Sequence, residues 1–119
     1  MSRSRAALML LADGRFPAGG YAHSGGLEES IRAGRVRDID DLDAFLRGRA
    51  ATTGLVSAAF AAAGCRAFVA GTALSALDAE LDARMPSPTM RDVSRTLGRQ
   101  LRRAVARMRP DPGLDRLGR

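Results

Sequence analysis

The single histidine of the chain, His23, lies next to Ser24, and these two residue types can together support nucleophilic catalysis. Residues 22–26 read AHSGG, which is one residue away from the Gly-x-Ser-x-Gly nucleophile elbow of hydrolases. That elbow requires a preceding strand and a separate histidine as the general base, and the sequence offers neither. The sequence therefore predicts no catalytic residues, and we do not expect Ser24 to be a nucleophile.

The same stretch is rich in glycine, as phosphate-binding loops are. Neither the P-loop pattern nor the dinucleotide-binding pattern occurs, and a chain without lysine cannot supply the P-loop lysine. Gly25 and Gly26 nevertheless precede a predicted helix, whose first N–H groups could meet an anion. Glu28 and Glu29 lie in the first turn of that helix, and we expect these carboxylates to complement its N-terminus instead.

His23 and Cys65 are the side chains that a transition metal would prefer. One cysteine excludes an intramolecular disulfide and a cysteine-based metal cage. Since no residues show ligand spacing, the sequence predicts no metal site and no cofactor, although a ring of His23 side chains from two subunits stays open as an alternative. We expect Cys65, in the run AAAGCRA, to be a small buried apolar side chain and His23 to pack within its loop.

All nineteen basic residues are arginine, and their distribution is uneven. Residues 1–83 hold nine arginines and ten acidic residues (net −1), whereas residues 84–119 hold ten and three (net +7). In the last predicted helix one stripe consists of arginine: Arg91, Arg95, Arg99, Arg102, Arg103 and Arg107. The alternatives are a solvated face, an acidic protein partner and, less favoured because stacking aromatics and known motifs are absent, a nucleic acid.

Helices must position these residues, because apolar side chains recur at helical spacing and no strand pattern occurs. We expect helices over residues 5–13, 27–33, a long segment capped by Asp38 or Asp40, 70–84 and 88–108. Gly34 is expected to end the second helix, and Ser87 with Pro88 to begin the last. The sequence therefore predicts an all-α fold. We expect a compact bundle of about five helices with one ordered glycine-rich loop, in one domain over residues 1–109, followed by a polar flexible tail over residues 110–119.

The long helix is expected to be central and contacted on most of its sides. Its larger apolar residues share one sector, and the opposite side is mostly alanine and glycine: the sector contains Leu42, Phe45, Leu46, Val56, Ala59, Phe60 and Ala63. Arg49 lies in the middle of this sector and should need a carboxylate or carbonyl partner, either in a structural pair or in a site. No apolar stretch approaches the roughly 18 residues of a membrane span, so we expect no membrane association and a cytoplasmic location.

Residues 14–26 contain five glycines and one proline, but also Phe16, Tyr21 and His23, so we expect an ordered loop rather than a flexible linker. The motif LADGRFPAGGYAHSGGLE at residues 11–28 resembles the signature of the urease accessory protein UreF family. The resemblance continues through FLRGR at residues 45–49 and through residues 82–101. It implies an all-helical, non-enzymatic protein that dimerises and bridges the UreD/UreH accessory protein to the nickel-carrying GTPase UreG on apo-urease.

The resemblance also implies a partner-binding surface. Its residues are those of the matching motifs: Phe16, Pro17, Gly19, Gly20, Tyr21, His23, Ser24, Gly25, Glu28, Arg95 and Arg99. In this hypothesis the glycines set the backbone geometry, Phe16 and Tyr21 anchor the loop, and Ser24 and Glu28 satisfy the start of the next helix. UreF-type chains are longer than this one, and their further helices would cover apolar faces. One alternative to a short scaffold is therefore a non-functional truncated remnant. The other, based on the arginine stripe, is an arginine-rich helical module that binds nucleic acid.

Overall fold

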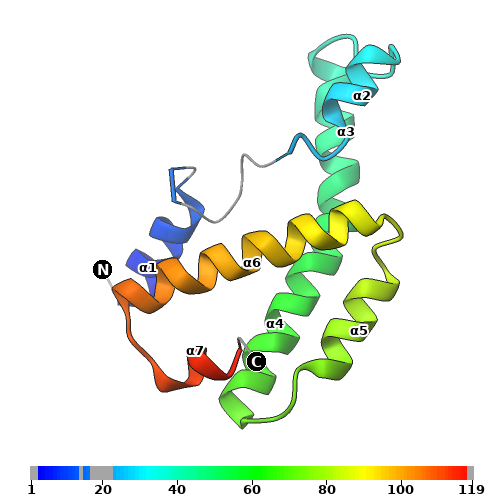
Figure 1. Ribbon diagram of the computed structural model, residues 1–119. Helices are drawn as coiled ribbons and strands as arrows, with labels where there is room; N and C mark the ends of the chain where they lie inside the picture. Colours follow the sequence, from blue (N-terminus) through cyan, green and yellow to red (C-terminus); the bar gives the residue numbers. More distant parts are fainter. Residues whose placement is uncertain (1–2, 14, 17–22, 118–119) are drawn as a thin grey trace. The chain divides into compact units, whose positions relative to one another are not determined.

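The computed structural model describes residues 3–13, 15–16 and 23–117, and these residues form helices without strands (Figure 1). The elements are α1 (Arg3–Ala12), α2 (Leu27–Arg32), α3 (Ile39–Arg49), the π-helical turn η1 (Ala50–Gly54), α4 (Leu55–Ala70), α5 (Ser75–Ala83), α6 (Pro88–Met108) and α7 (Pro112–Arg116). Because α3, η1 and α4 follow one another without a break, residues 39–70 are one continuous helix. The prediction of an all-α fold is confirmed.

The helices belong to two units, each of which we describe by itself. One unit contains α2, α3, η1, α4 and α5, and the other contains α1, α6 and α7. In the first unit α4 and α5 pack against each other after a turn (Figure 1). The Arg84 guanidinium lies 5.8 Å from the centre of the Phe60 ring, a cation–π contact that joins the end of α5 to α4. The extent of a single domain over residues 1–109 stays a prediction.

Two helix starts follow their sequence signals. The Asp38 carboxylate accepts a hydrogen bond of 2.9 Å from the backbone N–H of Asp41, so Asp38, and not Asp40, caps α3. The Ser87 hydroxyl accepts a hydrogen bond of 3.3 Å from the backbone N–H of Met90, and Pro88 occupies the first turn of α6. Both predicted boundaries are confirmed.

The boundary between α4 and α5 differs from the expected one. Gly71 adopts φ +68°, and the N–H of Thr72 donates to the carbonyl of Ala67 at 3.0 Å, which closes the last turn of α4. The next helix consequently begins at Ser75, and the prediction of a helix over residues 70–84 was wrong at its start. Gly34 ends α2 in the same way, as predicted, with φ +69°.

The tail contains a helix that the sequence analysis did not expect. The Asp111 carboxylate accepts a hydrogen bond of 2.7 Å from the N–H of Gly113 and so caps the five-residue helix α7. The guanidinium of Arg102 on α6 donates to the carbonyl of Leu114 at 3.4 Å, which connects α7 to α6. These contacts give part of residues 110–119 a defined structure.

Very little of the described chain is buried. Val36 is its only buried apolar side chain, and no described side chain is fully enclosed. On the continuous helix Leu55 is 65% exposed and Val69 81% exposed, and neither α3, η1 nor α4 has a buried residue. The prediction that this helix is contacted on most sides was wrong, because within its own unit little of the described chain packs against it. For the same reason Cys65 is exposed rather than buried.

The continuous helix is also long and apolar enough, by length and composition alone, to cross a membrane. The expectation of no membrane span rested on unbroken apolar runs, whereas Ala, Gly and Thr together with Leu, Val and Phe make residues 50–70 apolar on average despite Arg66. The central helix of a water-soluble assembly has the same composition when other protein surfaces cover it.

Candidate functional site

The described end of the glycine-rich segment forms a tight turn that leads into α2. Gly25 and Gly26 both have positive φ angles, +61° and +95°, and Gly26 is the N-cap residue of the helix. The N–H of Glu28 faces the hydroxyl of Ser24 at 3.5 Å, and the N–H of Ser30 donates to the carbonyl of Gly26 at 3.0 Å. The Ser24 hydroxyl thus accepts a long hydrogen bond from the first turn of α2.

Arg49 reaches this turn from the last residue of α3. Its guanidinium donates to the backbone carbonyl of Gly25 and lies where a side chain at residue 25 would begin. Arg49 is half-buried, and its partner is one of the two kinds that the sequence analysis named, a carbonyl group. A contact across 24 residues thus ties the glycine-rich segment to the long helix.

A π-helical turn follows Arg49 immediately. Within it the hydroxyl of Thr52 donates to the carbonyl of Gly48 at 2.8 Å, and a Cβ at Gly54 would lie 3.3 Å from the carbonyl oxygen of Arg49. Such turns inside α-helices are rare and often occur at functional sites. Arg49 therefore sits where the continuous helix departs from regular α geometry.

Paired charges surround the turn. Glu28 and Glu29 lie in the first turn of α2, and Glu29 forms an ion pair with Arg32. Ser24, Gly26 and these three charged residues line a shallow depression that is open to solvent. Because the carboxylates occupy the helix start, as expected, this depression does not favour an anion.

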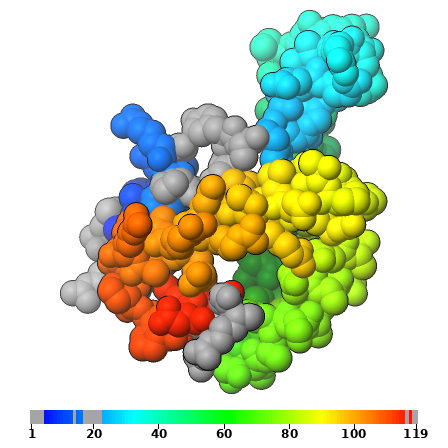
Figure 2. Space-filling model, viewed as in Figure 1, coloured from blue at the N-terminus to red at the C-terminus, as the bar shows by residue number. Residues whose placement is uncertain are grey.

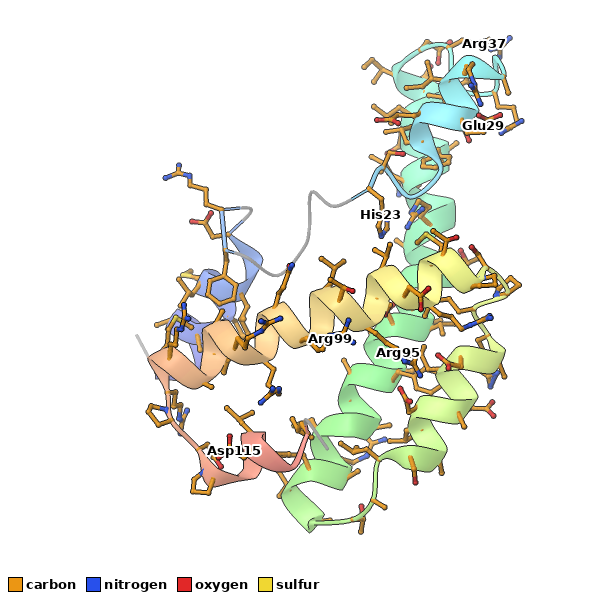
Figure 3. All side chains as sticks on the ribbon, viewed as in Figure 1. His23, Glu29, Arg37, Arg95, Arg99 and Asp115 are labelled. Carbon is orange, nitrogen blue, oxygen red and sulfur yellow. The ribbon has the colours of Figure 1, made fainter. Side chains whose placement is uncertain are left out.

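A second pair lies at the start of α3, where Figure 3 labels Arg37. The Arg37 guanidinium donates to the Asp41 carboxylate at 2.9 Å, and its backbone N–H donates to the same oxygen at 3.1 Å. These two hydrogen bonds hold the pKa of Asp41 below its usual value, and the contact raises the pKa of Arg37. The pair fixes the turn that enters α3.

The arginine stripe of α6 divides into two rows. Arg91, Arg95 and Arg102 are half-buried, and Arg91 donates to the carbonyl of Met85. The other three, Arg99, Arg103 and Arg107, are exposed at intervals of four residues. The helix runs across the visible face of Figure 2 as a yellow-to-orange band, and Figure 3 shows Arg95 and Arg99 one turn apart. The second row is the part of the stripe that a partner could reach.

The structure brings together three of the predicted partner-binding residues, Ser24, Gly25 and Glu28, in one turn. His23 is exposed beside them, whereas Phe16, Arg95 and Arg99 belong to the other unit. Phe16 is half-buried and its N–H donates to the carbonyl of Asp13 at 2.9 Å. Four further predicted residues lie outside the described residues: Pro17, Gly19, Gly20 and Tyr21. The contact between Arg49 and Gly25 was not predicted, although an arginine inside an apolar sector was a signal for such a partner.

Across residues 3–13, 15–16 and 23–117, no three histidine, cysteine, aspartate or glutamate side chains gather where they could hold a metal ion. The fold and the site thus define an all-helical protein with an arginine-anchored glycine turn and exposed arginines. A model of the UreF family matches residues 36–118. The chain belongs to the UreF family.

Curated relatives align with nearly the whole chain. The urease accessory protein UreF of Mycolicibacterium vanbaalenii is 47% identical over 97% of this chain and 54% of its own length. The proteins of the same name from Mycobacterium tuberculosis and Mycobacterium marinum are each 46% identical, over 97% and 95% of this chain and 53% and 52% of their own lengths. The chain therefore spans about half the length of these relatives. No solved structure matches it.

Proposed function

We propose that this chain acts as a non-enzymatic scaffold in the assembly of the nickel centre of urease, in the cytoplasm. In this role it bridges the UreD/UreH accessory protein to the GTPase UreG and presents both to apo-urease. The observation that carries the proposal is the 47% identity to a urease accessory protein over 97% of the chain.

Two surfaces are proposed to meet these partners. One is the turn at His23, Ser24, Gly25 and Glu28, together with the motif residues that precede it. Internal hydrogen bonds support this choice, because a turn that is already ordered loses less conformational entropy when a partner binds. The other is the exposed arginine row of α6, here represented by Arg99, with Arg95 beside it. Arginines at intervals of four residues suit an acidic protein surface, since guanidinium groups pair with carboxylates in a planar geometry.

The exposed apolar residues support association. Leu8, Leu55 and Val69 are 67%, 65% and 81% exposed. In water-soluble monomers, large exposed apolar surfaces are rare and mark sites of association. We propose that a second copy of the protein, in a homodimer, or further protein surface covers such residues in the working complex. This also accounts for the apolar composition of the helix over residues 39–70 without a membrane.

Affinity capture tests the proposal. The 119-residue chain is immobilised and offered purified UreD/UreH, UreG and duplex DNA separately, at low and at physiological salt. We expect retention of at least one accessory protein at physiological salt, and a weaker retention by the variant Arg99→Glu. Retention of DNA alone, with an affinity that falls steeply as salt rises, would contradict the proposal and support the nucleic-acid alternative.

A further inference from the structure

We infer that Arg49 is the positioning residue of the glycine turn: it holds residues 23–28 in the conformation that they present to a protein partner. The anchoring itself follows from the contacts of Arg49, whereas its consequence for partner binding rests on the function proposed above. In the sequence Arg49 stands 24 positions away from the turn that it contacts.

The geometry at Gly25 supports an anchor rather than a chance contact. The Arg49 guanidinium donates to the Gly25 carbonyl, and three of its atoms (one carbon and two nitrogens) occupy the place of a Cβ at residue 25. Gly25 also has φ +61°, which L side chains rarely adopt. The positive φ thus favours glycine at this position, and the guanidinium end of Arg49 would have to shift to admit a Cβ.

Gly26 provides an internal comparison. Its φ of +95° also favours glycine, but no heavy atom lies within 4 Å of the place that its Cβ would take. The two neighbouring glycines therefore have the same backbone requirement, and only Gly25 has the arginine against it. Any effect that depends on Arg49 should appear at residue 25 and not at residue 26.

The helical side of the contact is fixed as well. Arg49 ends α3 and is followed by the π turn, where the Thr52 hydroxyl donates to the Gly48 carbonyl at 2.8 Å and Gly54 leaves room for the Arg49 carbonyl. The backbone that carries the half-buried Arg49 side chain therefore has a defined position, and so does the Gly25 carbonyl that accepts its hydrogen bond. A flat guanidinium suits this arrangement, because it can lie against a glycine Cα while one of its N–H groups points at the carbonyl oxygen.

The test compares Arg49→Met, which keeps an unbranched apolar stem, with Arg49→Lys, which keeps a donor. Amide hydrogen exchange of the full 119-residue chain is followed at Glu28 and Ser30, whose N–H groups bond within the turn. Exchange at Met90, whose N–H is bonded to Ser87, serves as the control. We expect Arg49→Met to speed exchange in the turn about tenfold, in line with the loss of a charge-assisted hydrogen bond, with Met90 unchanged. The lysine variant should recover part of the protection.

A double-mutant cycle gives a second, independent measurement. Gly25→Ala and Gly26→Ala are each combined with Arg49→Met, and the urea midpoints of unfolding are compared. Removing the guanidinium should relieve part of the cost of alanine at residue 25, so that the double variant is more stable than the two single effects predict. At residue 26 the effects should add. Additive effects at both positions, or unchanged exchange in the methionine variant, would overturn the inference.

Partner capture separates this inference from the proposed function. If the native chain retains UreD/UreH or UreG, the methionine variant should bind about tenfold more weakly, and the lysine variant should bind better than the methionine variant. Equal binding by all three would overturn the positioning role even if the scaffold function holds. If the native chain retains neither protein, the proposed function fails, and the exchange rates and the cycle still decide whether Arg49 holds the turn.

Discussion

The sequence offers two aspartates as the cap of the long helix, and the structure assigns the role to Asp38. Its carboxylate accepts the Asp41 N–H at 2.9 Å, whereas Asp40 lies within the first turn of α3. Replacing a capping aspartate by alanine costs about 1 kcal/mol, and loss of a negative charge near the N-terminus adds roughly 0.3 kcal/mol at an exposed site. For a chain of this size, a change of 1 kcal/mol shifts the midpoint of thermal unfolding by about 4 °C. Asp38→Ala should therefore lower Tm by about 5 °C.

Two matched variants complete the experiment, which is read by circular dichroism during thermal and urea unfolding. Asp40→Ala removes a charge from the same turn but no capping hydrogen bond, so it should lower Tm by only about 1 °C. Asp38→Asn keeps an acceptor and should behave like Asp40→Ala. An equal or larger loss of stability in Asp40→Ala than in Asp38→Ala would refute the assignment of the cap.

Three further expectations concern the surface. The hydrogen bonds with Arg37 lower the folded-state pKa of Asp41. The stability that this pair contributes is therefore present above the unfolded-state pKa and is lost as pH falls through the folded-state pKa. Asp41→Asn should remove this pH-dependent component from an acid-unfolding profile. Cys65 is exposed, so a thiol reagent should label it completely without denaturant, and labelling that requires urea would show that it is buried. The apolar helix over residues 39–70 is expected to be covered by protein, so the chain should not float with lipid vesicles.

Local signals predicted local structure well. Ser87 followed by Pro88, and Gly34 after the short helix α2, each act on neighbouring backbone groups, and the structure has both boundaries where they were expected. The helix α7 also begins at a local signal, although this helix was not predicted. Asp111 followed by Pro112 is the same kind of start signal as Ser87 with Pro88, and it was overlooked because the helix is only five residues long.

Burial could not be predicted in the same way. The apolar faces of the helix over residues 39–70, and Cys65 on it, were expected to be covered because apolar residues usually are. Whether a face is covered depends on which other elements pack against it, and that is not encoded within the helix itself. The pairing of Gly25 with Arg49 was hidden for a related reason, since 24 residues separate the two and neither changes the periodicity of its surroundings.

We propose above that this chain connects two accessory proteins. Size-exclusion chromatography with light scattering tests it on UreD/UreH and UreG, mixed with and without the 119-residue chain. We predict that UreG elutes together with UreD/UreH only when the chain is present, in a complex whose mass includes all three, and that Arg49→Met reduces the amount of this complex. Separate elution of the two accessory proteins in the presence of the chain, with its helical circular dichroism intact, would contradict the claim.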